Sequence, residues 1–180
     1  MARKLTAAFA AMLLLVLGLA ACQKKTAEKA GEQAAPPRTD AVSWVGYTEG
    51  MKKAKETGKP AMVDFYTTWC KYCIMLDETT YKDPDVIEIL NRDFVAIKLN
   101  AEGAAEVEEG GKKMTEKELA ASYKVTGFPT IWFFDKKGQK IAPLPGYRPP
   151  EEFKPVLTFI TSGAYEKGVE YGDYLKSLKK

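Results

Sequence analysis

Short apolar runs predict the strands of this chain. Residues 61–67, 94–99 and 130–135 are each rich in β-branched, aromatic and other apolar residues, which is the pattern of buried strands. The polar turn Asp135-Lys136-Lys137-Gly138 predicts a hairpin. Residues 139–142 are therefore expected to return as a further strand.

Apolar residues at helical spacing, each set preceded by a capping residue, predict the helices. Ser43 is expected to cap a helix that ends at Gly58, and Thr115 with Glu118 forms a capping box before a later helix. Residues 101–114 are acidic, contain glycine and have few large apolar groups, so they are expected to form a loop. The other expected helix starts are Cys70, Asp83 with Pro84 in the first turn, Pro149-Pro150, and the tail from Glu166 onward.

The predicted elements run helix, strand, helix, helix, strand, helix, strand, strand, helix. The early strand–helix–strand part should hold parallel strands, whereas the strands of the later hairpin are antiparallel. The sequence therefore predicts an α/β fold in which a mixed central sheet has helices on both faces.

The N-terminus has the features of an export signal. Arg3 and Lys4 precede an apolar run over residues 7–20, which is short for a membrane span and is soon followed by polar residues. The run ends in Leu19-Ala20-Ala21-Cys22, which resembles the cleavage box of bacterial lipoproteins. That resemblance implies cleavage before Cys22 and lipidation of its thiol. An ordinary signal peptide followed by a chance cysteine is the alternative.

A flexible tether is expected after this cysteine. Residues 23–40 contain no large apolar residue, so they cannot form a core of their own. Gln23 stands where an aspartate would favour retention in the inner membrane, so a periplasm-facing lipid anchor is expected, with the outer membrane favoured. The expected organisation is a signal peptide over 1–21, the lipidated cysteine and tether over 22–40, a folded α/β domain over 41–165, and a C-terminal extension over 166–180.

Charge and composition exclude several classes of function. The net charge is +3, from 27 basic and 24 acidic residues, and no basic stripe indicates a nucleic-acid partner. The sequence contains no histidine, which rules out histidine-dependent triads and histidine-ligated zinc. Any acid–base chemistry must therefore use carboxylates, lysines, tyrosines or thiols.

Two cysteines, Cys70 and Cys73, remain once Cys22 is assigned to lipidation. A Cys-x-x-Cys pair in an exported protein is either a structural disulfide or a redox centre. Haem attachment would need histidine at position 74, which is Ile, and a zinc site would need two further ligands. No metal and no cofactor beyond a redox-active disulfide is therefore expected, although a metallochaperone that uses the two thiols is an alternative.

Five short motifs follow one another within residues 60–161: Val63-Asp64-Phe65, Trp69-Cys70-x-x-Cys73, Lys98-Leu99-Asn100, Gly127-Phe128-Pro129-Thr130 and Gly146. Together and in this order they resemble the thioredoxin superfamily. Within it the chain looks most like exported thioredoxin-like domains, such as the C-terminal domain of the disulfide-interchange protein DsbD and SoxW-type thioredoxins. Lys71-Tyr72 differs from the Gly-Pro of thioredoxin, so the redox potential does not transfer, and residues 101–118 are longer than in minimal thioredoxins.

The chemistry of thiols and the resemblance together indicate roles for four residues. Cys70 is expected at a helix N-terminus, where the helix dipole and backbone N–H groups favour a thiolate, so it is the expected nucleophile. Cys73, one turn further, would resolve the mixed disulfide. Asp64 should have a raised pKa if its strand is buried, and the resemblance implies that it moves the proton of the buried cysteine, with Lys98 as charge partner. An outward-facing Asp64 and a solvated Lys98 are the alternatives.

Three further residues are expected around the sulfur atoms. The resemblance implies a cis peptide bond before Pro129, which would bring the backbone of Phe128 beside Cys70 to pair with an extended substrate. Trp69 and Phe128 would then form an apolar lip around the sulfur. A trans proline and simple core packing of the two rings are the alternatives.

These features predict a thiol–disulfide oxidoreductase that is tethered to a membrane and reduces the disulfides of extracytoplasmic proteins. The resemblance to reducing domains implies recharging by a membrane electron donor of the DsbD type. An oxidase or isomerase with the same residues is an alternative, because the direction depends on how well the thiolate is stabilised. A non-catalytic lipoprotein that binds partners is a second alternative.

Overall fold

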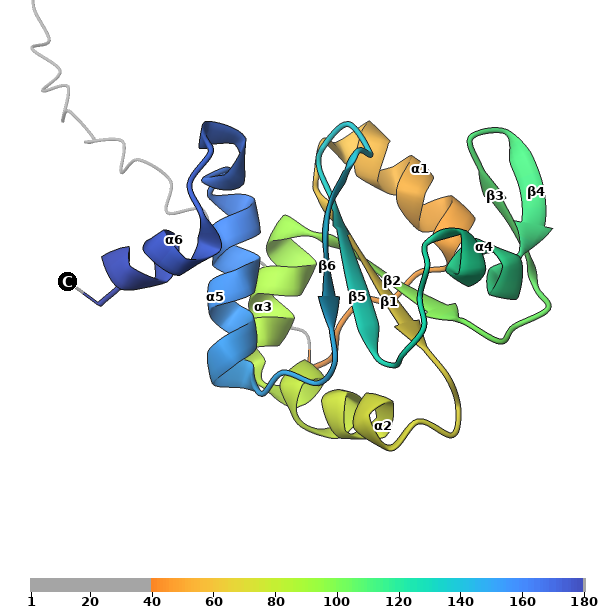
Figure 1. Ribbon diagram of the computed structural model, residues 1–180, viewed down its shortest axis with the longest axis horizontal. Coiled ribbons are helices and arrows are strands. Elements are labelled where there is room, and N and C mark those ends of the chain that lie inside the picture. Colours follow the sequence, from red (N-terminus) through yellow and green to blue (C-terminus); the bar gives the residue numbers. More distant parts are fainter. Residues whose placement is uncertain (1–39, 180) are drawn as a thin grey trace, which may run out of the picture. The chain divides into compact units, whose positions relative to one another are not determined.

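A four-stranded mixed sheet lies at the centre of the computed structural model, which describes residues 40–179 (Figure 1). The strand order is β2-β1-β5-β6. β1 is parallel to β2 and antiparallel to β5, and β6 returns antiparallel to β5. This confirms the predicted α/β fold with a mixed sheet. The strands are β1 (Ala61–Tyr66), β2 (Val95–Asn100), β5 (Thr130–Phe134) and β6 (Lys140–Pro145).

Helices cover both faces of this sheet, as expected. In Figure 1, α3 and α5 lie on one side of the strands and α1 and α4 on the other. Successive strand residues point to opposite faces: Met62 packs in the core with α3 and α5, while Val63 packs in the core with α1 and α4. The helices are α1 (Tyr47–Thr57), α2 (Lys71–Glu78), α3 (Pro84–Asp93), α4 (Glu116–Ser122) and α5 (Pro150–Thr161), with a 3-10 turn η1 (Thr80–Lys82) after α2.

The capping residues of two helices are confirmed. The Asp83 carboxylate accepts hydrogen bonds from the backbone N–H groups at the start of α3, and Pro84 occupies the first turn. Thr115 and Glu118 form the reciprocal capping box that opens α4. These bonds satisfy N–H groups that have no partner within a helix.

The predicted cap at Ser43 is wrong, because the chain around it is extended. Val45 forms a parallel bridge with Ile97 on the outer edge of β2. Its N–H and C=O are bonded to the backbone of the edge strand, so they cannot start a helix. α1 begins instead at Tyr47, and its N-cap is Gly46, which supplies no side-chain cap.

The expected loop over residues 101–114 is also wrong in its second half. Strands β3 (Glu106–Glu109) and β4 (Lys112–Thr115) form a small antiparallel hairpin. Gly110 and Gly111 between them both have positive φ, which a tight hairpin turn requires and glycine adopts at little cost. Buried Val107 joins the core, and Glu109 accepts a hydrogen bond from the Tyr47 hydroxyl at 3.1 Å. A hairpin anchored on only one buried apolar side chain leaves a weak hydrophobic pattern.

The tail forms a short helix, as expected. After a 3-10 turn η2 (Tyr165–Lys167), α6 (Tyr171–Ser177) packs on α5 through rings that contact Phe159. No helix between residues 40 and 179 has the length and apolar character needed to cross a membrane. The expected signal peptide, Cys22 and almost all of the expected tether lie outside the described residues.

Candidate active site

The two cysteines lie at the start of α2, directly after the loop that follows β1. Cys70 is the N-cap of this helix and Cys73 lies in its first turn. They form a disulfide, with Cα atoms 5.2 Å apart, a separation within the usual range for such a bridge. The strand ends at Tyr66, so a short loop presents the first cysteine at the edge of the core.

Backbone geometry at the start of α2 favours negative charge on the sulfur of Cys70. The N–H of Cys73 donates a hydrogen bond to the Sγ atom of Cys70 at 3.1 Å. The N-terminal end of a helix also carries a partial positive charge. Both effects would stabilise a thiolate at Cys70 after reduction. Cys70 is 5% exposed and Cys73 is 2% exposed, so both cysteines are buried in the oxidised protein, and the position of Cys70 at the N-cap is what distinguishes it as the nucleophile.

An aromatic ring stands beside the disulfide. Trp69 is 66% exposed, and its indole N–H donates a hydrogen bond to Glu102 at 2.8 Å. Its ring meets that of Phe128 edge to face, with centroids 6.1 Å apart. The two rings predicted to form a lip are therefore in contact, and Glu102 fixes the orientation of the exposed one.

The peptide bond between Phe128 and Pro129 is cis, as predicted. Pro129 immediately precedes Thr130, which pairs with Phe65 near the C-terminal end of β1. The loop to the cysteines leaves that same end of β1. The Pro129 carbonyl accepts a hydrogen bond from Gly146 N–H at 2.7 Å, so it is held against the segment after β6.

Asp64 is buried in β1 and is paired with Lys98. The two residues are direct neighbours in the register of β1 and β2, which puts their side chains on the same face of the sheet. The Lys98 ammonium lies 3.1 Å from Asp64 Oδ2, and the Asp64 side chain is 1% exposed. The outward-facing alternative for Asp64 and the solvated alternative for Lys98 are therefore wrong.

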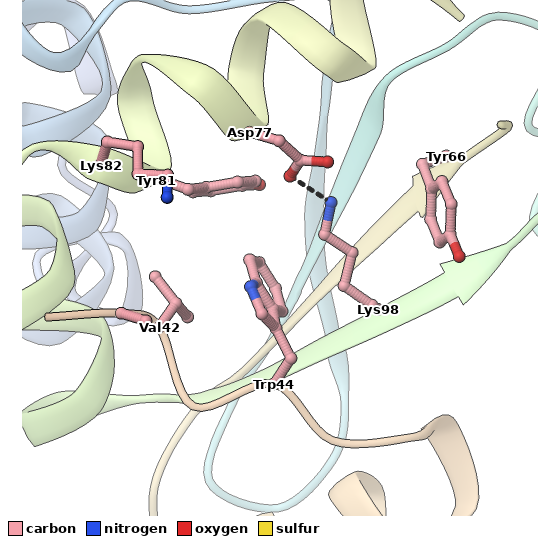
Figure 2. A pocket seen from close by; sticks show the side chains of 8 residues that line it. Val42, Trp44, Tyr66, Asp77, Tyr81, Lys82 and Lys98 are labelled. Carbon is pink, nitrogen blue, oxygen red and sulfur yellow. Dashed lines mark hydrogen bonds and ion pairs between the residues drawn. The ribbon is translucent and has the colours of Figure 1, made fainter. Parts of the chain in front are cut away.

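A second carboxylate, that of Asp77, shares this lysine. The Lys98 ammonium donates to Asp77 Oδ1 at 2.5 Å (Figure 2). Asp77 lies four residues after Cys73 on α2, so the two side chains lie on the same face of that helix. The face that carries the buried cysteine is thus the face that reaches the ion cluster.

Burial sets the direction of the pKa shifts in this cluster. It raises the pKa of the Asp64 carboxyl, and the opposing attraction of the Lys98 ammonium does not outweigh it. Burial acts to lower the pKa of Lys98, but the Asp64 and Asp77 carboxylates more than offset this, so that pKa is raised. Burial also raises the pKa of Tyr81, whose hydroxyl lies near Asp64 and makes no hydrogen bond of good geometry within the described chain.

Sequence reasoning missed three residues of this site. Asp77 had a signal, because a carboxylate one turn after Cys73 must share its helix face. Glu102 and Tyr81 had none, because each approaches from a loop or a 3-10 turn whose path depends on the tertiary fold.

Comparisons with known proteins agree with this geometry. Residues 47–161 match the family model of the thioredoxin-like domain. The chain is 27% identical over 143 residues to the disulfide bond reductase DsbH of Chlamydia pneumoniae, a match that covers 79% of this chain and 85% of that protein. It is 37% identical over 89 residues to the thiol:disulfide interchange protein DsbD of Salmonella typhi, covering 48% of this chain but only 14% of that much longer protein.

A solved structure points the same way. A thioredoxin-fold protein from Helicobacter pylori superposes with a TM-score of 0.62 at 28% identity, and the match covers 78% of this chain and 88% of that one. In this family the paired cysteines carry the chemistry and no cofactor is required. The chain therefore belongs to the thioredoxin-like domain family and is a thiol–disulfide oxidoreductase whose redox-active pair is Cys70 and Cys73.

Proposed function

We propose that this protein is tethered to a bacterial membrane, faces the periplasm and reduces disulfides of extracytoplasmic proteins. The observation that carries the direction of the reaction is the similarity to the disulfide bond reductase DsbH over most of both chains. Electrons would come from a membrane donor of the DsbD type, in keeping with the match to one segment of DsbD.

The proposed reaction begins with the thiolate of Cys70. It attacks one sulfur of the substrate disulfide, forms a mixed disulfide and releases the other substrate sulfur as a thiolate. Cys73 then loses its proton and attacks Cys70 Sγ, which re-forms the protein disulfide and releases the second substrate thiolate. The two released thiolates take up protons from water. Two electrons have then passed to the substrate, and the donor must return two electrons for each turnover.

The ion cluster is suited to taking the proton of Cys73. Two carboxylates, Asp64 and Asp77, face the single ammonium of Lys98. When both are ionised the group carries an excess negative charge next to the buried Asp64 carboxylate, which is costly. A proton on Asp64 leaves the neutral Lys98–Asp77 pair. We therefore assign Asp64 as the proton acceptor, with Lys98 and Asp77 as the groups that set its proton affinity.

The lip of Trp69 and Phe128 is assigned to substrate contact. An exposed ring beside a reactive sulfur offers apolar area to a partner at a small entropic cost. Glu102 restrains the indole of Trp69 through its hydrogen bond, so this side chain loses less conformational entropy when a substrate binds. The extended segment that leads through Pro129 into β5 would pair with the backbone of the substrate.

The direction of the reaction is tested by activity and by the redox state in cells. We expect the full-length protein in detergent to reduce insulin disulfides with dithiothreitol as donor, and Cys70→Ser to leave only the uncatalysed rate. After acid quench and thiol alkylation, we expect Cys70 and Cys73 to be mostly reduced in cells. A pair that stays oxidised in cells and fails to reduce insulin would favour the oxidase over the reductase.

The lipid anchor is tested separately through Cys22. The sequence before it resembles a lipoprotein cleavage box, and two or more acyl chains give stable anchoring. We expect metabolic labelling with a fatty acid to mark the protein, and Cys22→Ser to abolish the label and release the protein into the soluble fraction. A labelled Cys22→Ser protein, or one that stays at the membrane, would contradict the anchor.

A further inference from the structure

The segment just before α1 lies along the exposed edge of the sheet. We call residues 42–46 the edge segment. β2 is the edge strand, and Val45 accepts a hydrogen bond from Lys98 N–H at 3.1 Å and donates one to the Ala96 carbonyl at 3.0 Å. Neighbouring residues of an extended chain point to opposite sides, and Trp44 packs against the core on the face that carries Asp64 while Val45 packs on the other.

Trp44 lies against the ammonium of Lys98. The Lys98 Nζ atom is 5.0 Å from the centre of the Trp44 ring, 4.9 Å from that of Tyr66 and 5.3 Å from that of Tyr81 (Figure 2). All three distances are within the range of cation–π attraction. The Trp44 ring also meets Tyr81 edge to face at 4.8 Å. The edge segment, β1 and η1 thus each place one ring on the same ammonium.

The Lys98 ammonium has space beside it into which it could move. A cavity of about 390 Å³ borders it, lined by Trp44, Tyr66, Asp77 and Tyr81 among others. The Asp77 side chain is 46% exposed, whereas that of Asp64 is 1% exposed. Water and the exposed carboxylate therefore compete with the buried carboxylate for a long, flexible side chain.

We propose that Trp44 is a positioning residue that holds the Lys98 ammonium at the buried carboxylate of Asp64. The inference rests on the proposed function, in which Asp64 accepts the proton of Cys73, and it adds a residue from outside the matched domain to that step. Without the ring, the ammonium would keep its bond to the exposed Asp77 carboxylate and turn into the cavity toward solvent, away from Asp64. Asp64 would then lose part of its counter-charge.

The titration of Asp64 distinguishes this role from simple packing. The charged and titratable groups that face it are Lys98 from β2, Asp77 from α2 and Tyr81 from η1, while its neighbour on β5 is the apolar Ile131. If Trp44 holds the ammonium, removing the ring raises the pKa of Asp64, because an opposite charge is lost. If Trp44 only excludes water, removing it lowers that pKa, because the carboxylate becomes better solvated.

The experiment is a carboxyl ¹³C NMR titration of the full-length oxidised protein. We expect Trp44→Leu, which keeps apolar cover without a ring, to raise the pKa of Asp64 by about half a unit or more. Trp44→Phe, which keeps a ring, should stay near the parent value, and Trp44→Met serves as a second ring-free variant. An unchanged or lowered pKa in both ring-free variants would overturn the proposal.

A matched control and an independent readout complete the test. Trp132 lies on the opposite face, with the Lys140 ammonium 6.0 Å from its ring, so Trp132→Phe should leave the pKa of Asp64 unchanged. The titration needs no substrate and no turnover. A raised pKa in Trp44→Leu together with normal exchange in Asp64→Asn would therefore support the positioning role and reject the proton role of Asp64.

Discussion

Replacing Cys73 with serine is expected to trap the substrate, and replacing Cys70 with serine is expected to abolish exchange altogether. The buried serine hydroxyl cannot attack Cys70 Sγ, so the mixed disulfide formed by Cys70 persists. Without Cys70 the pair keeps only the buried Cys73 thiol inside the first turn of α2, which is not expected to open the substrate disulfide. A serine hydroxyl stays protonated at neutral pH, so we expect the rate to fall on the order of 10³-fold or more.

The measurement is the yield of mixed disulfide on non-reducing gels, with identification of the trapped proteins by mass spectrometry. Cys73→Ser should give covalent complexes that disappear with dithiothreitol, and the double variant should give none. Complexes formed by Cys70→Ser alone would reverse the assignment of nucleophile and resolving cysteine. If Trp69 contacts substrates, adding Trp69→Ala to Cys73→Ser should lower the yield of complexes without changing the redox state of the free protein.

Much of this fold follows from patterns that are local in the sequence. Residues 61–67 and 130–135 are short apolar runs bounded by turn residues, and each became a central strand. Asp83 and Thr115 place a capping side chain directly before an apolar stripe. In each case the side chains that decide the conformation lie within a few residues of one another, so the sequence alone contains the signal.

Features that depend on distant partners were missed. Ser43 resembles a helix cap, but the unpaired edge of β2 binds the edge segment and keeps it extended. The hairpin of β3 and β4 has a Gly-Gly turn but little apolar pattern, because Val107 is its one fully buried side chain. Asp77 on α2 has a local signal in its spacing from Cys73, but its ion pair with Lys98 on β2 depends on the tertiary fold.

Burial of the Asp64 carboxyl should make the stability of the folded protein depend on pH. Burial raises the pKa of this carboxyl in the folded protein, so the folded state binds a proton more tightly than the unfolded chain. Stability must then fall as pH rises from the unfolded pKa of about 4 up to the folded pKa, and stays reduced above it. Each unit of pKa difference is worth about 1.4 kcal/mol.

Asp64→Asn is therefore expected to stabilise the oxidised protein at pH 8, with little gain below about pH 4, where Asp64 is protonated in both states. The measurement is denaturant unfolding at both pH values. Asp77→Asn is the matched control, because it removes a neighbouring negative charge that raises the pKa of Asp64. The pKa of Asp64 should therefore fall in that variant.

The same Asp64→Asn substitution that stabilises the fold should slow disulfide exchange. An amide cannot accept the proton of Cys73, so we expect resolution of the mixed disulfide to slow about 10²-fold at neutral pH. In the parent protein that step should accelerate as pH rises through the pKa of Asp64, and single-turnover kinetics should show this rise disappear in the variant. A variant that is more stable but equally fast would mean that the proton leaves Cys73 by another route, and that Asp64 is a buried charge without a part in the exchange.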